Sequence, residues 1–94
     1  MNMTIPTPKE KVFHTSGKKI EVEIIFESEP TLERGYVPTC YLYINSDDRT
    51  QDAASSLDCA KDQGGLERYD NGQIVRIPMS IINRIEEWAV ENGY

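Results

Sequence analysis

Cysteine and histidine are scarce in this chain of 94 residues, which contains two cysteines and a single histidine, His14. A zinc site needs about four such ligands, commonly in close pairs. Cys40 and Cys59 lie far apart in sequence and form no CxxC motif. In a reducing compartment a disulfide between them is not expected. The sequence therefore predicts no metal, no cofactor and two small, partly buried thiols.

Long apolar runs are also missing. No stretch approaches the roughly 20 apolar residues that a membrane-spanning helix requires. The opening residues "MNMTIPTPKEK" lack the apolar segment of a secretory signal. These two absences predict a cytoplasmic protein without a membrane partner.

Catalytic and nucleotide-binding motifs are equally absent. His14 has no evident Ser or Asp partner for a triad, and a Cys59–His14 pair would require a shared pocket. The glycine pair in "DQGGLE" lacks both the P-loop lysine and the GxGxxG spacing. The acids near Asp47 and Asp52 lack the central glycine and terminal glutamate of an EF-hand loop. We therefore expect a protein that is not an enzyme.

Basic residues are outnumbered, with 10 Lys and Arg against 16 Asp and Glu, a net charge of −6 and a pI near 4.7. Nucleic-acid backbones are bound by clustered Lys and Arg, so direct nucleic-acid binding is not expected. An acidic balance suits solubility, and it equally suits a protein that docks on a basic surface.

Alternating apolar and polar residues predict the first strands. We expect a flexible tail over residues 1–10 and a single domain over 11–94, which opens with a hairpin of residues 11–15 and 18–27. In its second arm Ile20, Val22, Ile24 and Phe26 share one face, and Lys19, Glu21 and Glu23 share the other. Residues 39–45 form a third strand, and either of its faces is suitable for the core.

The period then changes to that of a helix. Ala53, Ala54, Leu57 and Ala60 form a small apolar stripe, with a cap expected near Asp48 or Thr50 and an end at Gly64–Gly65. A second hairpin follows, over residues 66–69 and 73–77, around the strong Asn71–Gly72 turn signal.

The last segment predicts an amphipathic helix with Ser80 as its N-cap and Gly93 just beyond its end. Its apolar stripe comprises Ile81, Ile82, Ile85, Trp88 and Ala89, with Trp88 as the expected main anchor. The resulting order, ββ-β-α-ββ-α, predicts an α+β fold. It is an antiparallel sheet of four to five strands with both helices packed on one face.

The segment "QIVRIPMSIINRIEEWAVENGY" resembles the first half of a ribbon-helix-helix repressor or antitoxin. A short strand at residues 73–77 is followed by Pro78 and an amphipathic helix. The resemblance implies a DNA-binding dimer. Such proteins also have a second helix, which these residues do not supply, and Arg76 is the one basic residue of the strand.

In size and acidity the chain is similar to the small accessory proteins of bacteriophages and mobile elements, including anti-CRISPR and anti-restriction inhibitors. The resemblance implies a non-enzymatic inhibitor that blocks a basic, nucleic-acid-processing host protein by steric or charge-mimicking occupation of its surface. The expected contact residues are Glu21, Glu23, Glu29, Glu33, Arg34, Tyr36, Asp47 and Asp48. The same acids equally fit ordinary solubilising charge.

Two alternatives remain open at this point. One is the ribbon-helix-helix-like regulator, which would use the C-terminal strand and helix. The other is a structural or assembly subunit in which exposed tyrosines make a homodimer contact.

Overall fold

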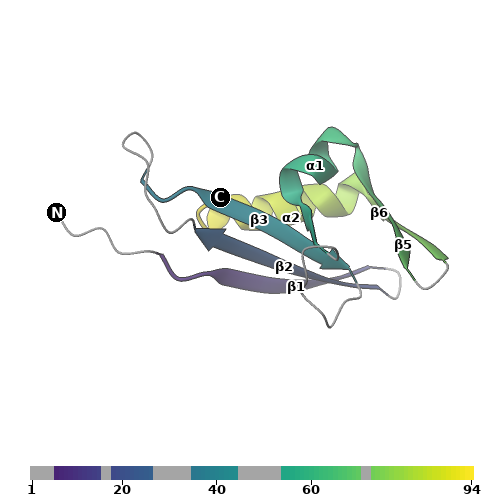
Figure 1. Cartoon of the computed structure of the whole chain (residues 1–94), viewed down its shortest axis with the longest axis horizontal. Helices are drawn as coiled ribbons and strands as arrows, with labels where there is room; N and C mark the ends of the chain where they lie inside the picture. Colours follow the sequence, from purple (N-terminus) through teal and green to yellow (C-terminus); the bar gives the residue numbers. More distant parts are fainter. Residues whose placement is uncertain (1–5, 16–17, 27–34, 45–53, 71–72) are drawn as a thin grey trace.

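A computed structural model of the chain describes residues 6–15, 18–26, 35–44, 54–70 and 73–94. It contains two antiparallel sheets and two helices (Figure 1). In chain order the elements are β1 (Lys9–Thr15), β2 (Lys18–Phe26), β3 (Pro38–Ile44), β4 (Ala54–Ser56), α1 (Leu57–Asp62), β5 (Gly65–Asp70), β6 (Gln73–Pro78) and α2 (Met79–Glu91).

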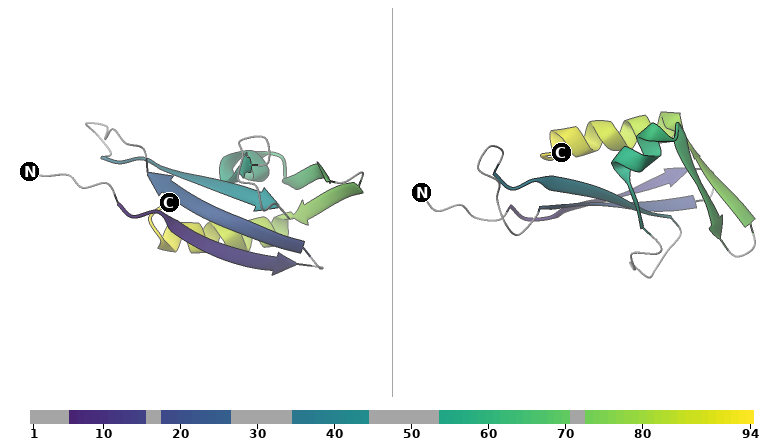
Figure 2. Two further views of the ribbon diagram at one scale, coloured as in Figure 1. Left: turned by 60° about the horizontal axis from the view of Figure 1, so that its bottom comes forward. Right: turned by 45° about the horizontal axis from the view of Figure 1, so that its top comes forward.

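The larger sheet has the strand order β1-β2-β3-β4, and every neighbouring pair is antiparallel. The hairpin β5–β6 forms a sheet of its own beyond one end of the larger sheet (Figure 1). Both helices lie on one side of the larger sheet (Figure 2). The predicted α+β class is confirmed, although the second hairpin forms a separate sheet.

The first hairpin follows the predicted alternation. Ile20, Val22 and Ile24 are at most 1% exposed. They lie on the side of β2 that faces α2, and this side belongs to the hydrophobic core. The strand β1 begins at Lys9, two residues before the predicted start, because Lys9 and Glu10 pair with Ile24 and Glu23. The predicted tail boundary at residue 10 therefore falls inside the sheet.

The strand β3 supplies the second part of the core, and the structure decides which of its faces is buried. Cys40, Leu42 and Ile44 all point inward, with exposures of 5% or less. Their burial follows from the register, since Leu42 pairs with Val22 and Cys40 with Ile24. Residues paired across antiparallel strands lie on the same face of the sheet.

The predicted first helix is wrong in its length and its start. Ala54 belongs to the short strand β4 and pairs with Tyr43, so the helix begins only at Leu57. The N-cap is Ser56, whose hydroxyl accepts a hydrogen bond from the Cys59 amide at 3.2 Å. Pairing to the edge of β3 satisfies backbone groups there, and this outweighs the helical spacing of the small alanines.

The C-terminal helix packs as an amphipathic helix, but its cap and anchor differ from the prediction. Strand pairing continues to Pro78, which pairs with Gly65 and is itself the N-cap, so Ser80 already lies inside the first turn. Ile82, Ile85 and Ala89 are fully buried. Trp88 is only partly buried and contacts Phe13 edge-on, with ring centroids 6.2 Å apart. It borders the core.

Candidate functional site

The outer face of the larger sheet, turned away from both helices (Figure 2), carries Glu21 and Glu23, two of the three predicted contact residues that the structure describes. The third, Tyr36, lies just before β3. We define this outer face by the alternate positions of β1, β2 and β3 that point away from the core. They are Glu10, Val12, His14, Lys19, Glu21, Glu23, Ile25, Thr39, Tyr41 and Tyr43.

The register arranges the acids and tyrosines of this face in rows across the strands. One row runs from Glu10 through Glu23 to Tyr41, and the next runs from Val12 through Glu21 to Tyr43. Two carboxylates in directly opposed positions are unfavourable for sheet stability. The Glu10–Glu23 pair is therefore expected to destabilise the sheet locally. The other contacts of the sheet offset this loss of stability.

Two of these carboxylates are held by neighbouring side chains. Glu21 forms an ion pair with Lys19 at 3.3 Å, and its side chain is only 18% exposed. The hydroxyl of Tyr43 donates a hydrogen bond to Glu23 Oε2 at 3.4 Å. Because such contacts restrict rotamers before any partner arrives, they reduce the entropy that binding would cost.

The tyrosine side chains of this region differ in how far they are exposed to solvent. Tyr41 on the outer face and Tyr36, shortly before β3, are half-buried, and Tyr43 is 8% exposed. Tyrosine is enriched in protein–protein interfaces because a large apolar ring carries a polar tip. Acids and half-buried tyrosines on one face give a surface that is suited to contact with a protein.

The other five predicted site residues lie outside the described residues. They are Glu29, Glu33, Arg34, Asp47 and Asp48. Sequence reasoning missed Glu10, which was assigned to the tail. The available signal was the alternation of Glu10, Val12 and His14, which extends the strand pattern toward the N-terminus.

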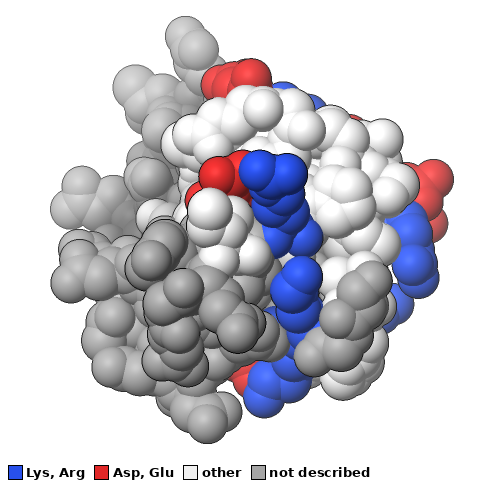
Figure 3. All heavy atoms as spheres, turned by 90° about the vertical axis from the view of Figure 1, so that its right-hand side faces the viewer, with Lys and Arg blue, Asp and Glu red and all other residues white. Residues whose placement is uncertain are grey.

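Basic side chains gather at one end of the molecule despite the net negative charge. Figure 3 views the end where β2 begins and the β5–β6 hairpin projects, and Lys and Arg side chains lie in a line across it. Lys18 opens β2 at this end, and Arg76 of β6 pairs with Glu67 at 3.0 Å. The register places the Glu10–Glu23 row toward the opposite end of β1 and β2.

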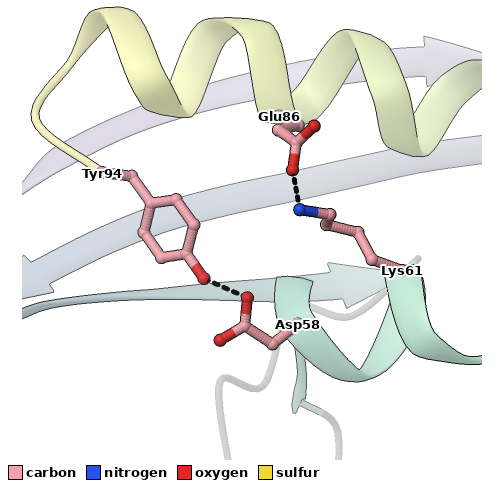
Figure 4. A network of polar contacts seen from close by, with 4 residues as sticks. All are labelled: Asp58, Lys61, Glu86 and Tyr94. Carbon is pink, nitrogen blue, oxygen red and sulfur yellow. Dashed lines mark hydrogen bonds and ion pairs between the residues drawn. The ribbon is translucent and has the colours of Figure 1, made fainter.

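Two polar contacts join α1 to α2 and to Tyr94 (Figure 4). The Tyr94 hydroxyl donates a hydrogen bond to Asp58 Oδ1, and Lys61 forms an ion pair with Glu86. Burial and the bond to Asp58 raise the pKa of Tyr94 well above its usual range. The hydrogen bond with Glu86 raises the pKa of Lys61. Because these contacts join α1 to α2 and to Tyr94, we assign the four side chains a role in stabilising the fold.

The remaining features of the described residues include an exposed histidine and a surface depression. Within them, no three His, Cys, Asp or Glu side chains come together as a metal site, and no helix is long and apolar enough to cross a membrane. His14 is exposed on the outer face of β1. An open, mostly apolar depression of about 500 Å³ lies beside Gly64 and Gly65, and Glu67 and Arg76, which form an ion pair, are among the residues that line it.

The two thiols differ sharply, and this gives a direct test of the packing. Cys40 is 1% exposed, and burial, with a smaller effect of Asp58, raises its pKa to about 12. Cys59 is exposed on α1, so the predicted partial burial of this thiol is wrong. A thiol reagent at pH 8 is expected to label Cys59 quickly and Cys40 only as the protein unfolds, because the thiolate is the reactive form. Rapid modification of two thiols per native chain, measured by mass spectrometry, would contradict this packing.

Comparison with known proteins provides no relative from which a role could be transferred. No protein family model, curated protein or solved structure matches the chain.

Proposed function

We propose that the protein is a non-enzymatic binding module that occupies a basic surface of another protein through the outer face of its larger sheet. The observation that carries this proposal is the grouping of Glu10, Glu21 and Glu23 beside Tyr41 on the face opposite the helices. Antiparallel pairing fixes the backbone positions of these residues. The backbone therefore needs little further ordering when a partner binds.

The partner that fits this surface best is a protein whose own ligand is a nucleic acid. Such proteins present Lys and Arg toward phosphates, and carboxylates spaced along a strand are able to occupy the same positions. Occupation of that surface would block the partner, as in the bacteriophage inhibitors that the chain resembles in size and acidity. Because the attraction is between charges at the protein surface, we expect the affinity to fall as salt is raised.

The test is affinity capture from a nuclease-treated bacterial lysate, with recovered proteins identified by mass spectrometry. Wild-type protein is expected to recover a basic nucleic-acid-binding protein, and a variant carrying Glu21→Gln and Glu23→Gln is expected to bind it about 10- to 100-fold more weakly, or about 1.4–2.8 kcal/mol. The matched control carries Asp62→Asn and Glu67→Gln. It loses the same charge at exposed sites away from the outer face.

Equal binding by the wild type and both variants would refute the role of the outer face. A shift of duplex DNA by the protein alone, at physiological salt, would instead support the regulator alternative. In the structure the apolar side of α2 packs on its own sheet, with Ile82 and Ile85 fully buried. This packing favours a role for the strand–proline–helix segment in closing the core.

A further inference from the structure

The strand β1 forms one edge of the larger sheet. Within the described part of the chain it pairs with β2 along all seven residues and with no strand on its other side (Figure 1). An edge strand presents a row of backbone N–H and C=O groups that is able to template another strand. Val12, at its centre, is 44% exposed.

The register identifies which backbone groups point outward from this edge. Thr15 pairs with Lys18, and only two residues separate them, so this closing pair is hydrogen-bonded in the manner of a two-residue hairpin. Hydrogen-bonded pairs alternate along an antiparallel ladder. The N–H and C=O groups of Glu10, Val12 and His14 therefore face away from β2. A strand added here must pair with these three residues.

The sequence of β1 is complementary to itself when a second copy runs antiparallel with Val12 opposite Val12. This register places Glu10 opposite His14, Lys11 opposite Phe13, and Lys9 opposite Thr15 in both directions. An acid then faces an imidazole, and a cation faces an aromatic ring. Lys11 already lies over its own Phe13 ring, 5.2 Å from the centroid.

The neighbouring registers that preserve the hydrogen-bond pattern pair fewer residues and bring identical side chains opposite each other. A shift toward the N-terminus places Lys11 opposite Lys11 and leaves only residues 9–13 paired. A shift the other way leaves only residues 11–15 paired and places Phe13 opposite Phe13. The register centred on Val12 pairs all seven residues of β1 and opposes no like charges. It is therefore the favoured register.

The groove beside β1 also suits a second copy. It has a volume of about 230 Å³ and is lined by Lys11, Phe13, Arg84, Glu87, Trp88 and Glu91. Two cations and two anions balance one another there, although the whole chain carries −6. A twofold axis perpendicular to the joined sheet keeps both α2 helices on the same side. Two such balanced grooves meet without the net repulsion that an acidic face would produce.

We propose that the chain forms a symmetric homodimer in which the β1 strands of two copies pair antiparallel, centred on Val12, to give one continuous eight-stranded sheet. Dimerisation leaves Glu21 and Glu23 on the outer face and places two outer faces side by side. It is independent of the proposed binding function, because it depends on the edge of the sheet rather than on that face.

Sedimentation velocity of the purified full chain, from micromolar to millimolar concentration, tests the dimer. We expect wild type to form dimers and Val12→Lys to remain monomeric, because two like charges would then meet at the axis. The matched control, Val90→Lys, adds the same charge at a site that is 62% exposed on α2, and it should still dimerise. Circular dichroism verifies that each variant is folded.

Mixing experiments distinguish a second copy from any other occupant of the edge. Val12→Lys and Val12→Glu are each expected to be monomeric alone and to form a heterodimer when mixed, because opposite charges then face each other across the axis. A monomeric wild type at all concentrations, or a Val12→Lys variant that still dimerises, would overturn the proposal. So would edge pairing that occurs only with an added peptide from another protein.

Discussion

Replacement of Ile85 by alanine is expected to lower the free energy of unfolding by about 3–4 kcal/mol. Ile85 is fully buried on α2 and belongs to the single described core cluster, so the substitution removes apolar contacts and leaves a cavity. A domain of this size has only about 5–10 kcal/mol of stability in total. The measurement is urea unfolding at fixed protein concentration, followed by the fluorescence of Trp88.

The matched control is Val90→Ala on the same helix. Val90 is 62% exposed, so its truncation should change the free energy of unfolding by less than about 0.5 kcal/mol. If Ile85→Ala proves too unstable to purify, Ile85→Val is expected to cost about 1 kcal/mol. Similar losses for Ile85→Ala and Val90→Ala would show that α2 does not pack on the sheet as described.

Replacement of Gly65 by alanine is expected to cost about 2–4 kcal/mol. Gly65 opens β5 with φ +133°, a conformation that is almost restricted to glycine. A Cβ at this position would lie 2.8 Å from the carbonyl oxygen of Ile77, on the paired strand. Backbone strain and a backbone clash therefore add together where α1 leads into the second hairpin.

The adjacent Gly64 separates these two effects. Its φ of +72° is unfavourable for alanine, but a Cβ there would meet nothing within 4 Å. Gly64→Ala should therefore cost only about 1 kcal/mol, the usual price of the left-handed conformation. Equal losses for the two substitutions, measured by thermal and urea unfolding, would contradict the close approach of Gly65 to β6.

Local sequence patterns correctly predicted the buried side of an element wherever one of its faces is strictly apolar. The alternation in β2 predicted which side of the strand is buried, and the spacing of Ile82, Ile85 and Ala89 predicted the packed side of α2. Asn71–Gly72 predicted a hairpin whose flanking strands pair as expected, with Asp70 opposite Gln73. In each case a short-range pattern and the final burial favour the same conformation.

The same signals failed where a distant strand competes with local preference. Ala54 fits a helical stripe, yet it pairs with Tyr43 in β4, and Ser80 gives way to Pro78 as the cap because β6 extends further than expected. Glu10 looked like part of a tail until its pairing with Glu23 placed it in the sheet. The pairing of Ala54 lies outside the periodic pattern of its own segment, whereas the alternation of Glu10, Val12 and His14 already extends the first strand toward the N-terminus.

The sequence by itself determined the fold class, the strands of both hairpins and the apolar side of the C-terminal helix, because these depend on periodicity and turn residues. Only the tertiary structure decided the burial of Cys40, the Glu10–Glu23 row and the exposed edge of β1. The physical reason is that side-chain burial, strand ends and strand order arise from contacts between segments that no single periodic pattern spans. These contacts determine which acids share a face and which backbone groups lie at the edge of the sheet.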